Sequence, residues 1–185
     1  GQTGAARLAA RGALRIGAGL VTVGVPPAAQ QEVASQITAL MLKRVYDDAA
    51  LQALLQDPRF KALCLGPGLG VERARELVPV ALAAQHATVL DADALTAFAQ
   101  DPEALFDMLH KDCVLTPHGG EFKRLFPDIH AKLAQPLDNE SRRFMTVEFQ
   151  FRMRLQVAAP GFHLICIGSN AVQDRHGLDS LFTFI

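Results

Sequence analysis

The fold class of this sequence is decided by Ala62-Leu63-Cys64-Leu65-Gly66-Pro67-Gly68-Leu69-Gly70 and by the helix-like residues 71–84 that follow it. The first four residues form a short apolar run typical of a buried strand, and the glycines and Pro67 make a tight connection. Pro79 is expected to bend the helix that comes next. A strand that passes through a short loop into a helix is the unit from which parallel α/β sheets are built.

The same unit recurs on both sides of this segment. We predict further strands at residues 20–25, 87–90 and 113–115, and helices at residues 4–16, 30–44, 48–56, 93–100, 102–110 and 121–125. Residues 20–25 are almost continuously apolar, which is typical of a strand covered on both faces. We therefore expect an α/β fold whose central sheet is mostly parallel, with the four strands side by side and helices on both faces.

The composition is that of a globular domain. The chain has 185 residues and a mass of 20.0 kDa, with 50% hydrophobic and 20% charged residues, which excludes intrinsic disorder. A net charge of −1 gives no bulk attraction to nucleic acid or to an anionic membrane, so neither is expected as a partner. No apolar run is long enough for a transmembrane helix, and no signal peptide is expected at Gly1.

The three cysteines, Cys64, Cys113 and Cys166, are far apart in the sequence and form no Cys-x-x-Cys or Cys/His pair. We interpret them as small apolar side chains of a protein in a reducing compartment rather than as zinc ligands.

Ligands of open α/β sheets bind beyond the carboxyl ends of the strands, so the residues after each predicted strand are the candidates for a site. The loop 66–70 can bring backbone N–H groups to an anion at a helix N-terminus. It matches neither the Walker A pattern nor Gly-x-Gly-x-x-Gly, and a plain tight turn is the alternative. Asp91 and Asp93 follow the next strand; such acids bind a metal, hold a ribose hydroxyl or act as a base, while Asp93 alternatively caps the following helix.

His118 follows the strand 113–115 and can donate a hydrogen bond to a phosphate, a ribose or a carbonyl group. Glu121 is expected in the first turn of the next helix, where its charge suits the helix dipole. Arg7, Arg11 and Arg15 form a stripe on the first helix, which we interpret as a solvated face, with a phosphate-facing role as the alternative.

Five motifs carry a family resemblance. They are Thr3-Gly4-Ala5-Ala6 with Leu8-Ala9-Ala10, Gly17-Ala18-Gly19-Leu20-Val21-Thr22-Val23, Leu65-Gly66-Pro67-Gly68-Leu69-Gly70, Leu90-Asp91-Ala92-Asp93-Ala94-Leu95 and Leu115-Thr116-Pro117-His118-Gly119-Gly120-Glu121-Phe122. In this order they resemble the ADP/ATP-dependent NAD(P)H-hydrate dehydratases of the ribokinase-like superfamily, with Gly119 where the family has proline. The resemblance implies a single ribokinase-like domain over residues 1–185, in which residues 1–136 match the family and residues 137–185 diverge from it.

The resemblance implies an enzyme of nicotinamide-cofactor repair. Such a hydro-lyase removes water from (6S)-NADHX or NADPHX and couples this step to hydrolysis of ADP or ATP, with Mg²⁺. Carried over by motif, Ala5, Gly68 and His118 are expected to contact the hydrated dinucleotide, and Asp91 to line the same cleft. The resemblance further implies a cytoplasmic homo-oligomer.

One family motif has no counterpart. The Gly-Thr-Gly-Asp loop, whose Asp is the expected base, is not found in residues 137–185, and the nearest segment, Gly168-Ser169-Asn170, does not have its spacing. No catalytic or nucleotide-binding residue is therefore assigned. Two alternatives stay open: another ribokinase-like kinase for a small molecule, and a catalytically inactive binding or assembly fragment.

Overall fold

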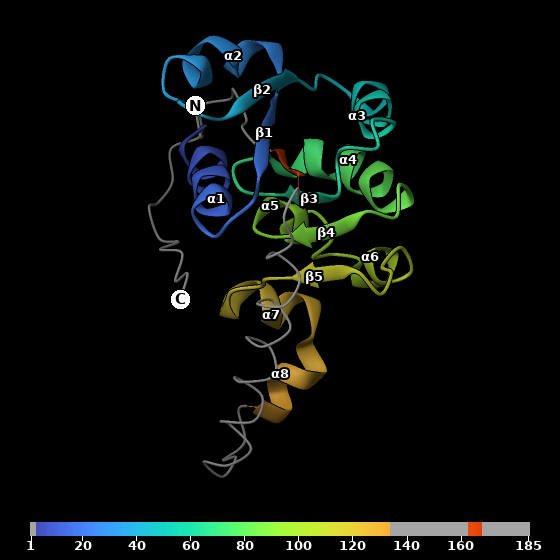
Figure 1. Cartoon of the computed structure of the whole chain (residues 1–185). Coiled ribbons are helices and arrows are strands. Elements are labelled where there is room, and N and C mark those ends of the chain that lie inside the picture. Colours follow the sequence, from blue (N-terminus) through green and yellow to red (C-terminus); the bar gives the residue numbers. More distant parts are fainter. Residues whose placement is uncertain (1–2, 134–162, 168–185) are drawn as a thin grey trace.

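Six strands form one parallel sheet in the computed structural model, which describes residues 3–133 and 163–167 (Figure 1). They are β1 (Leu20–Val25), β2 (Met41–Arg44), β3 (Ala62–Leu65), β4 (Ala87–Leu90), β5 (Cys113–Leu115) and β6 (His163–Ile167). Their order across the sheet is β2-β1-β6-β3-β4-β5, and every neighbouring pair is parallel. The four predicted strands are confirmed with their boundaries, and so is the parallel α/β fold.

The prediction that these four strands lie side by side is wrong at one place. β6 lies between β1 and β3, and Cys166 is in register with Val23 on one side and with Cys64 on the other. Both partners of β6 are separated from it by about a hundred residues of sequence or more, so no local pattern announces the pairing. We assigned no element to residues 137–185, and β6 is the part of that segment that the structure describes.

The predicted helix over residues 30–44 is confirmed only as far as Ala34 and is wrong beyond it. The structure has a shorter helix, α2 (Pro27–Ala34), and the strand β2 at the edge of the sheet. Ala39 has a φ of 60°, which lies outside the right-handed helical region and ends any helix there. Met41–Arg44 then pairs with β1, so the tertiary hydrogen bonds of the sheet override the local pattern.

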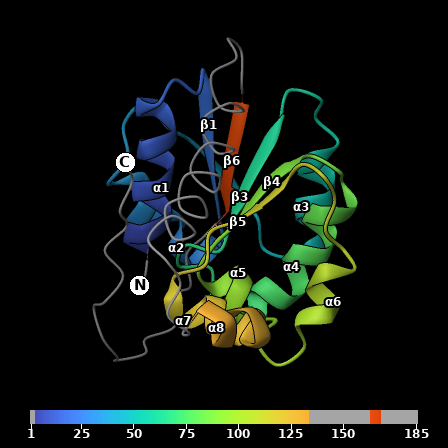
Figure 2. The same cartoon turned by 90° about the horizontal axis from the view of Figure 1, so that it is seen from below.

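Helices cover the sheet on both faces, as predicted. α1 (Thr3–Arg15) and α2 lie on one side, and α3 (Asp48–Leu55), α4 (Val71–Ala83) and α6 (Pro102–Phe106) lie on the other (Figure 2). The remaining helices are α5 (Asp93–Thr96), α7 (Gly119–Leu125) and α8 (Pro127–Leu133). Among the helices that the structure describes, none combines the length and the apolar character needed to cross a membrane.

Two of these helices end earlier than predicted. α5 stops at Thr96 and α6 at Phe106, where the predictions extended to residues 100 and 110. The chain beyond them continues in tighter turns, because Ala99 N–H donates to the Thr96 carbonyl and Leu109 N–H to the Phe106 carbonyl. These i to i−3 bonds are those of a 3₁₀ turn, so the backbone keeps turning past the helix ends without α-helical hydrogen bonds.

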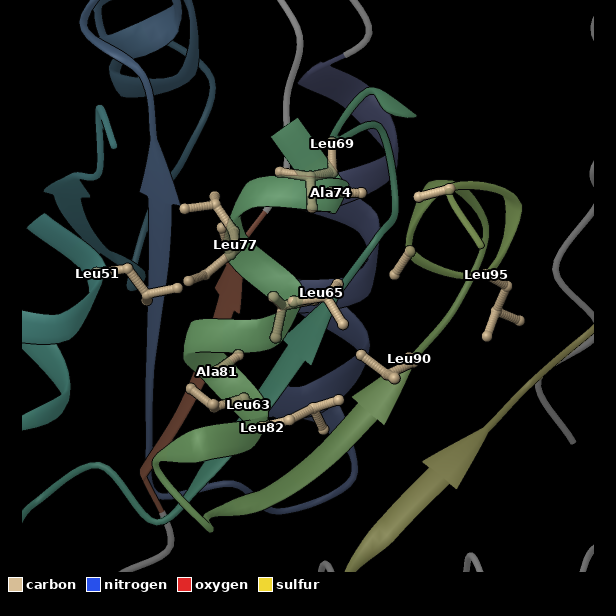
Figure 3. Close-up of a cluster of buried hydrophobic side chains, with 14 of the residues drawn as sticks. Leu51, Leu63, Leu65, Leu69, Ala74, Leu77, Ala81, Leu82, Leu90 and Leu95 are labelled. Carbon is tan, nitrogen blue, oxygen red and sulfur yellow. The ribbon is translucent and has the colours of Figure 1, made fainter. Parts of the chain in front are cut away.

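The two faces of the sheet have different cores. On the side of α3, α4 and α5 the buried cluster is rich in leucine, and we call it the leucine face; it includes Leu51, Leu63, Leu65, Leu77, Leu82, Leu90 and Leu95 (Figure 3). On the side of α1 and α2 the cluster consists mainly of alanine and valine, and we call it the alanine face; it includes Ala6, Ala10, Ala13, Val21, Val23 and Val25. Of the three cysteines, which were expected to be small apolar side chains of the interior, Cys166 is buried and Cys64 and Cys113 are half-buried.

Candidate functional site

Three loops meet at the carboxyl ends of β3, β4 and β5. The backbone links them, because Asp91 N–H donates to the Leu65 carbonyl at 3.0 Å and Thr116 N–H donates to the Leu90 carbonyl at 3.0 Å. Gly66 packs directly against the next loop, since a Cβ atom built on it would lie 1.6 Å from the Asp91 carbonyl oxygen. The loops that carry Gly68, Asp91 and His118 therefore form one connected surface at this edge of the sheet.

The loop after β3 is a tight turn. Leu69 N–H donates to the Gly66 carbonyl at 2.9 Å, Pro67 is the second residue of the turn, and Gly68 has a φ of 66° as its third. This arrangement is that of a type II turn, in which the third position needs a positive φ. Gly70 N–H donates to the Asp93 carboxylate at 2.7 Å. Two amides of the loop are thus satisfied by the protein itself, which favours the tight-turn interpretation over the anion cradle.

The turn after β4 contributes two carboxylates with different partners. Burial raises the pKa of Asp91, and a hydrogen bond with the Thr116 hydroxyl, the Ala92 N–H and the nearby His118 oppose that rise. Asp93 does not cap α5: the N-cap position is Ala92, without a side-chain bond, and Asp93 lies in the first helical turn. Its carboxylate instead reaches Gly70 of the neighbouring loop, a contact that the sequence analysis missed.

His118 begins α7 and is held by a capping box with Glu121. The His118 Nδ1 atom accepts from Gly120 N–H at 3.0 Å, and the Glu121 carboxylate accepts from His118 N–H at 2.9 Å. Because Nδ1 accepts a hydrogen bond, a neutral ring carries its proton on Nε2, which lies 3.1 Å from a Glu121 oxygen. The His118 side chain is 60% exposed and that of Glu121 only 5%. The exposed His118 ring therefore directs its Nε2–H at the buried Glu121 carboxylate.

Glu121 was predicted only as a charge near the start of the helix. Its position in the first turn of α7 is confirmed. The hydrogen bond that its carboxylate accepts from His118 N–H was not predicted. Burial raises the pKa of Glu121, and the His118 N–H bond and the charges of His118 and Arg124 oppose that rise. The spacing His-x-x-Glu before an apolar residue is the signal that would have found this capping box, with histidine in the place of serine or threonine.

Ala5 lies in a helix that covers the alanine face, whereas the three loops lead into helices that pack on the leucine face. It belongs to α1, which contacts β1 and β6 on the alanine face, and it is half-buried. α1 leads through a short turn into β1 and packs on it, so the helix runs opposite to the strand and begins near the carboxyl edge. The structure thus brings Gly68, Asp91 and His118 together by direct contacts between their loops, and brings Ala5 to the same edge without such a contact.

The arginine stripe of α1 lies mostly in solvent, and the described residues form no metal-binding group. Arg11 and Arg15 are exposed, and Arg7 is half-buried and donates to Gln36, which agrees with a mostly solvated face. Within residues 3–133 and 163–167, no group of three His, Cys, Asp or Glu side chains is arranged to hold a metal ion. We therefore assign Mg²⁺ to no residue.

A six-stranded parallel sheet with helices on both faces, and with polar loops gathered at its carboxyl edge, defines an α/β protein of the ribokinase-like class. A family model described as NAD(P)H-hydrate dehydratase matches residues 1–155. The chain belongs to the NAD(P)H-hydrate dehydratase family, which confirms the resemblance stated from the motifs. No solved structure gave a significant match.

Three relatives show the range of the similarity. A bifunctional NAD(P)H-hydrate repair enzyme of Synechocystis is 40% identical over 131 residues, which is 68% of this chain and 25% of that protein. ATP-dependent (S)-NAD(P)H-hydrate dehydratases of Aedes aegypti and Homo sapiens are 33% and 34% identical over 79% and 75% of this chain. The chain spans about a quarter of the bifunctional relative and less than half of the other two, 46% and 40%.

Proposed function

We propose that this chain acts in nicotinamide-cofactor repair, in the nucleotide-dependent dehydration of (6S)-NADHX and NADPHX to NADH and NADPH. The observation that carries the proposal is the connected surface of the three loops, in a chain whose relatives are named for this reaction. Hydroxide is a poor leaving group, and ADP or ATP with Mg²⁺ supplies the phosphoryl group that activates it. The task left to the protein is mainly positioning and electrostatic.

Each candidate residue has a role that its surroundings support. Gly68 and Ala5 leave room for the dinucleotide because they carry little or no side chain. His118 is exposed at the start of α7, so its Nε2–H, which lies 3.1 Å from a Glu121 oxygen, can be shared with an acceptor oxygen of the substrate. Asp91 is half-buried at the centre of the surface, where it can accept a hydrogen bond from a substrate hydroxyl or take up a proton.

Isothermal titration of the 185-residue chain with NADPHX tests the site. We expect His118→Ala to weaken binding by about 1–3 kcal/mol, the cost of leaving a buried acceptor unpaired once the ligand covers the ring. Gly68→Val should block binding, because a branched side chain would occupy the ligand's space at a position with a φ of 66°. Arg11→Ala, on the exposed stripe of α1, is the matched control with unchanged affinity. Wild-type affinity in both His118→Ala and Gly68→Val would remove the site assignment.

A second candidate is a chain that binds the cofactor without turning it over. It is kept as the alternative because the Gly-Thr-Gly-Asp motif of the family was not found in residues 137–185. Incubation with NADPHX, ATP or ADP and Mg²⁺, followed by the absorbance of NADPH, separates the two: formation of NADPH with release of inorganic phosphate supports the dehydratase. Transfer of phosphate to another small molecule would instead indicate a kinase of the same class.

The compartment and assembly belong to the same proposal. We take the protein to be a cytoplasmic homo-oligomer, in keeping with a soluble cofactor as substrate. Size-exclusion chromatography with light scattering tests the assembly, and a monomer at micromolar concentration would contradict it.

A further inference from the structure

The backbone between the two carboxylates of the β4–α5 turn is strained. Ala92 has φ and ψ of 48° and −115°, a combination that residues with a Cβ atom rarely adopt. Such a conformation persists only where the surrounding contacts determine it, and it is concentrated at functional sites. The contacts around Ala92 therefore indicate what the strain achieves.

Neighbouring groups fix Ala92 from both sides. The Asp91 N–H is bonded to β3, and the Asp91 carbonyl oxygen lies against Gly66, where no side chain fits. The Ala92 carbonyl accepts from the N–H groups of Leu95 and Thr96 in α5. The turn is thus held between a strand and a helix.

The strained turn sends its two carboxylates to different loops. Asp91 lies beside the Thr116 hydroxyl of the β5–α7 loop, whereas Asp93 accepts from Gly70 N–H of the β3–α4 loop. The Asp93–Gly70 distance of 2.7 Å is typical of a hydrogen bond to an ionised acceptor, which is stronger than a neutral one. Gly70 has a φ of 86°, so its N–H direction depends on a conformation that favours glycine.

The loop that Asp93 holds has a flexible composition. Gly66, Gly68 and Gly70 all have positive φ values, and glycine has more conformational freedom to lose than any other residue. A ligand that had to order this loop would bind more weakly, because the ordering entropy would be lost at the moment of binding. A carboxylate that fixes the end of the loop in the free protein removes that cost.

We propose that Asp93 is a positioning residue, which clamps the Gly66–Gly70 loop so that Gly68 faces Asp91 and His118 before the substrate arrives. The Asp93–Gly70 hydrogen bond is the contact that forms the clamp. The expected effect of the clamp on substrate binding rests on the proposed function. Asp93 itself need not touch the substrate.

The test compares Asp93→Ala with Asp93→Asn, which keeps an acceptor oxygen. Amide hydrogen exchange of Gly70, followed by NMR in the ligand-free 185-residue chain, reports the clamp directly. Titration with NADPHX reports its consequence. We expect Asp93→Ala to speed exchange of Gly70 and to weaken NADPHX binding by about tenfold, with Asp93→Asn restoring most of both.

Asp47→Ala is the matched control, because the Asp47 carboxylate accepts from a backbone N–H at 2.8 Å at the start of α3, outside the three loops. It should lower the melting temperature without changing NADPHX affinity. The proposal is overturned if Gly70 exchange is the same in Asp93→Ala and the wild type, or if Asp47→Ala weakens binding as much as Asp93→Ala does. If no protein binds NADPHX while Gly70 exchange still follows Asp93, the clamp stands and the proposed substrate is wrong.

Discussion

The leucine face and the alanine face cover the same sheet, yet they are packed in different ways. On the leucine face, large side chains from α3, α4 and α5 interlock with those of β3 and β4. On the alanine face, α1 presents Ala6, Ala10 and Ala13 to the valines of β1, so little more than backbone separates helix from strand. The first packing is sensitive to lost volume and the second to added volume, because protein interiors tolerate neither voids nor excess atoms.

The candidate site draws on both faces. Gly68, Asp91 and His118 stand on loops that lead into α4, α5 and α7, whereas Ala5 belongs to α1 on the alanine face. Four substitutions, on the two faces and in the loops, test this difference, and their expected effects decrease in turn.

Gly66→Ala should have the largest effect. The new Cβ would lie 1.6 Å from the Asp91 carbonyl oxygen, at a φ of 124°, so strands β3 and β4 could not keep their present separation at the carboxyl edge. We expect failure to fold or a loss of at least about 4 kcal/mol by urea denaturation. Gly119→Ala is the control, with no atom within 4 Å of its added Cβ, and should be near neutral. Equal stability of the two variants would contradict the prediction.

Leu77→Ala tests the sensitivity of the leucine face to lost volume. The Leu77 side chain is fully buried between α4 and the sheet, and its removal leaves a cavity that the surrounding elements cannot close (Figure 3). We expect a loss of about 2–5 kcal/mol in the free energy of unfolding. A loss under about 1 kcal/mol would show that this face repacks freely, and the contrast between the faces would fail.

Ala10→Leu tests the sensitivity of the alanine face to added volume. Ala10 is fully buried against β1, so a larger side chain must push α1 away from the sheet. We expect a loss of about 1–3 kcal/mol in the free energy of unfolding. Leu8→Ala, on the same helix but 54% exposed, should be within about 0.5 kcal/mol of the wild type. A stabilising Ala10→Leu would mean that this face is loosely packed.

Asp91→Asn should have the smallest effect, and it depends on pH. Because burial raises the pKa of Asp91, the folded state binds the proton more tightly than the unfolded state, and this contribution to stability is lost as pH rises from the ordinary value of 3.8 through the raised one. The variant removes the buried charge, so it should be more stable than the wild type at neutral pH. Melting temperatures across pH 3 to 8 give the check: an advantage that grows as pH falls would contradict it.

The sequence was sufficient for the elements that local pattern defines. The strands β1, β3, β4 and β5 are short apolar runs bounded by loops, and each was predicted with its boundaries. The site loops followed from the same reasoning, because strand ends in a parallel sheet meet at one edge. The five motifs that carry the family resemblance end at Phe122, and the family model matches residues 1–155.

What the sequence could not predict depends on contacts between distant residues. Met41–Arg44 resembles a helix until its pairing with β1 is known, and β6 has its partners far away in the chain. The Asp93–Gly70 bond joins residues 23 positions apart, so local rules offered only a ligand-facing acid or a helix cap for Asp93. The roles of Ala5, Gly68, Asp91 and His118 toward a substrate remain predictions.

The position of β6 affects how the protein folds while it is being synthesised on the ribosome. β1 and β3 are synthesised early, but the strand that joins them is not translated until residues 163–167. Until then β1 and β3 each lack a hydrogen-bonding neighbour in the middle of the sheet, and unpaired edges invite association with other chains. Closing the sheet then requires the ends of long intervening segments to meet, which slows folding. The nascent chain is thus exposed to aggregation until β6 has been made.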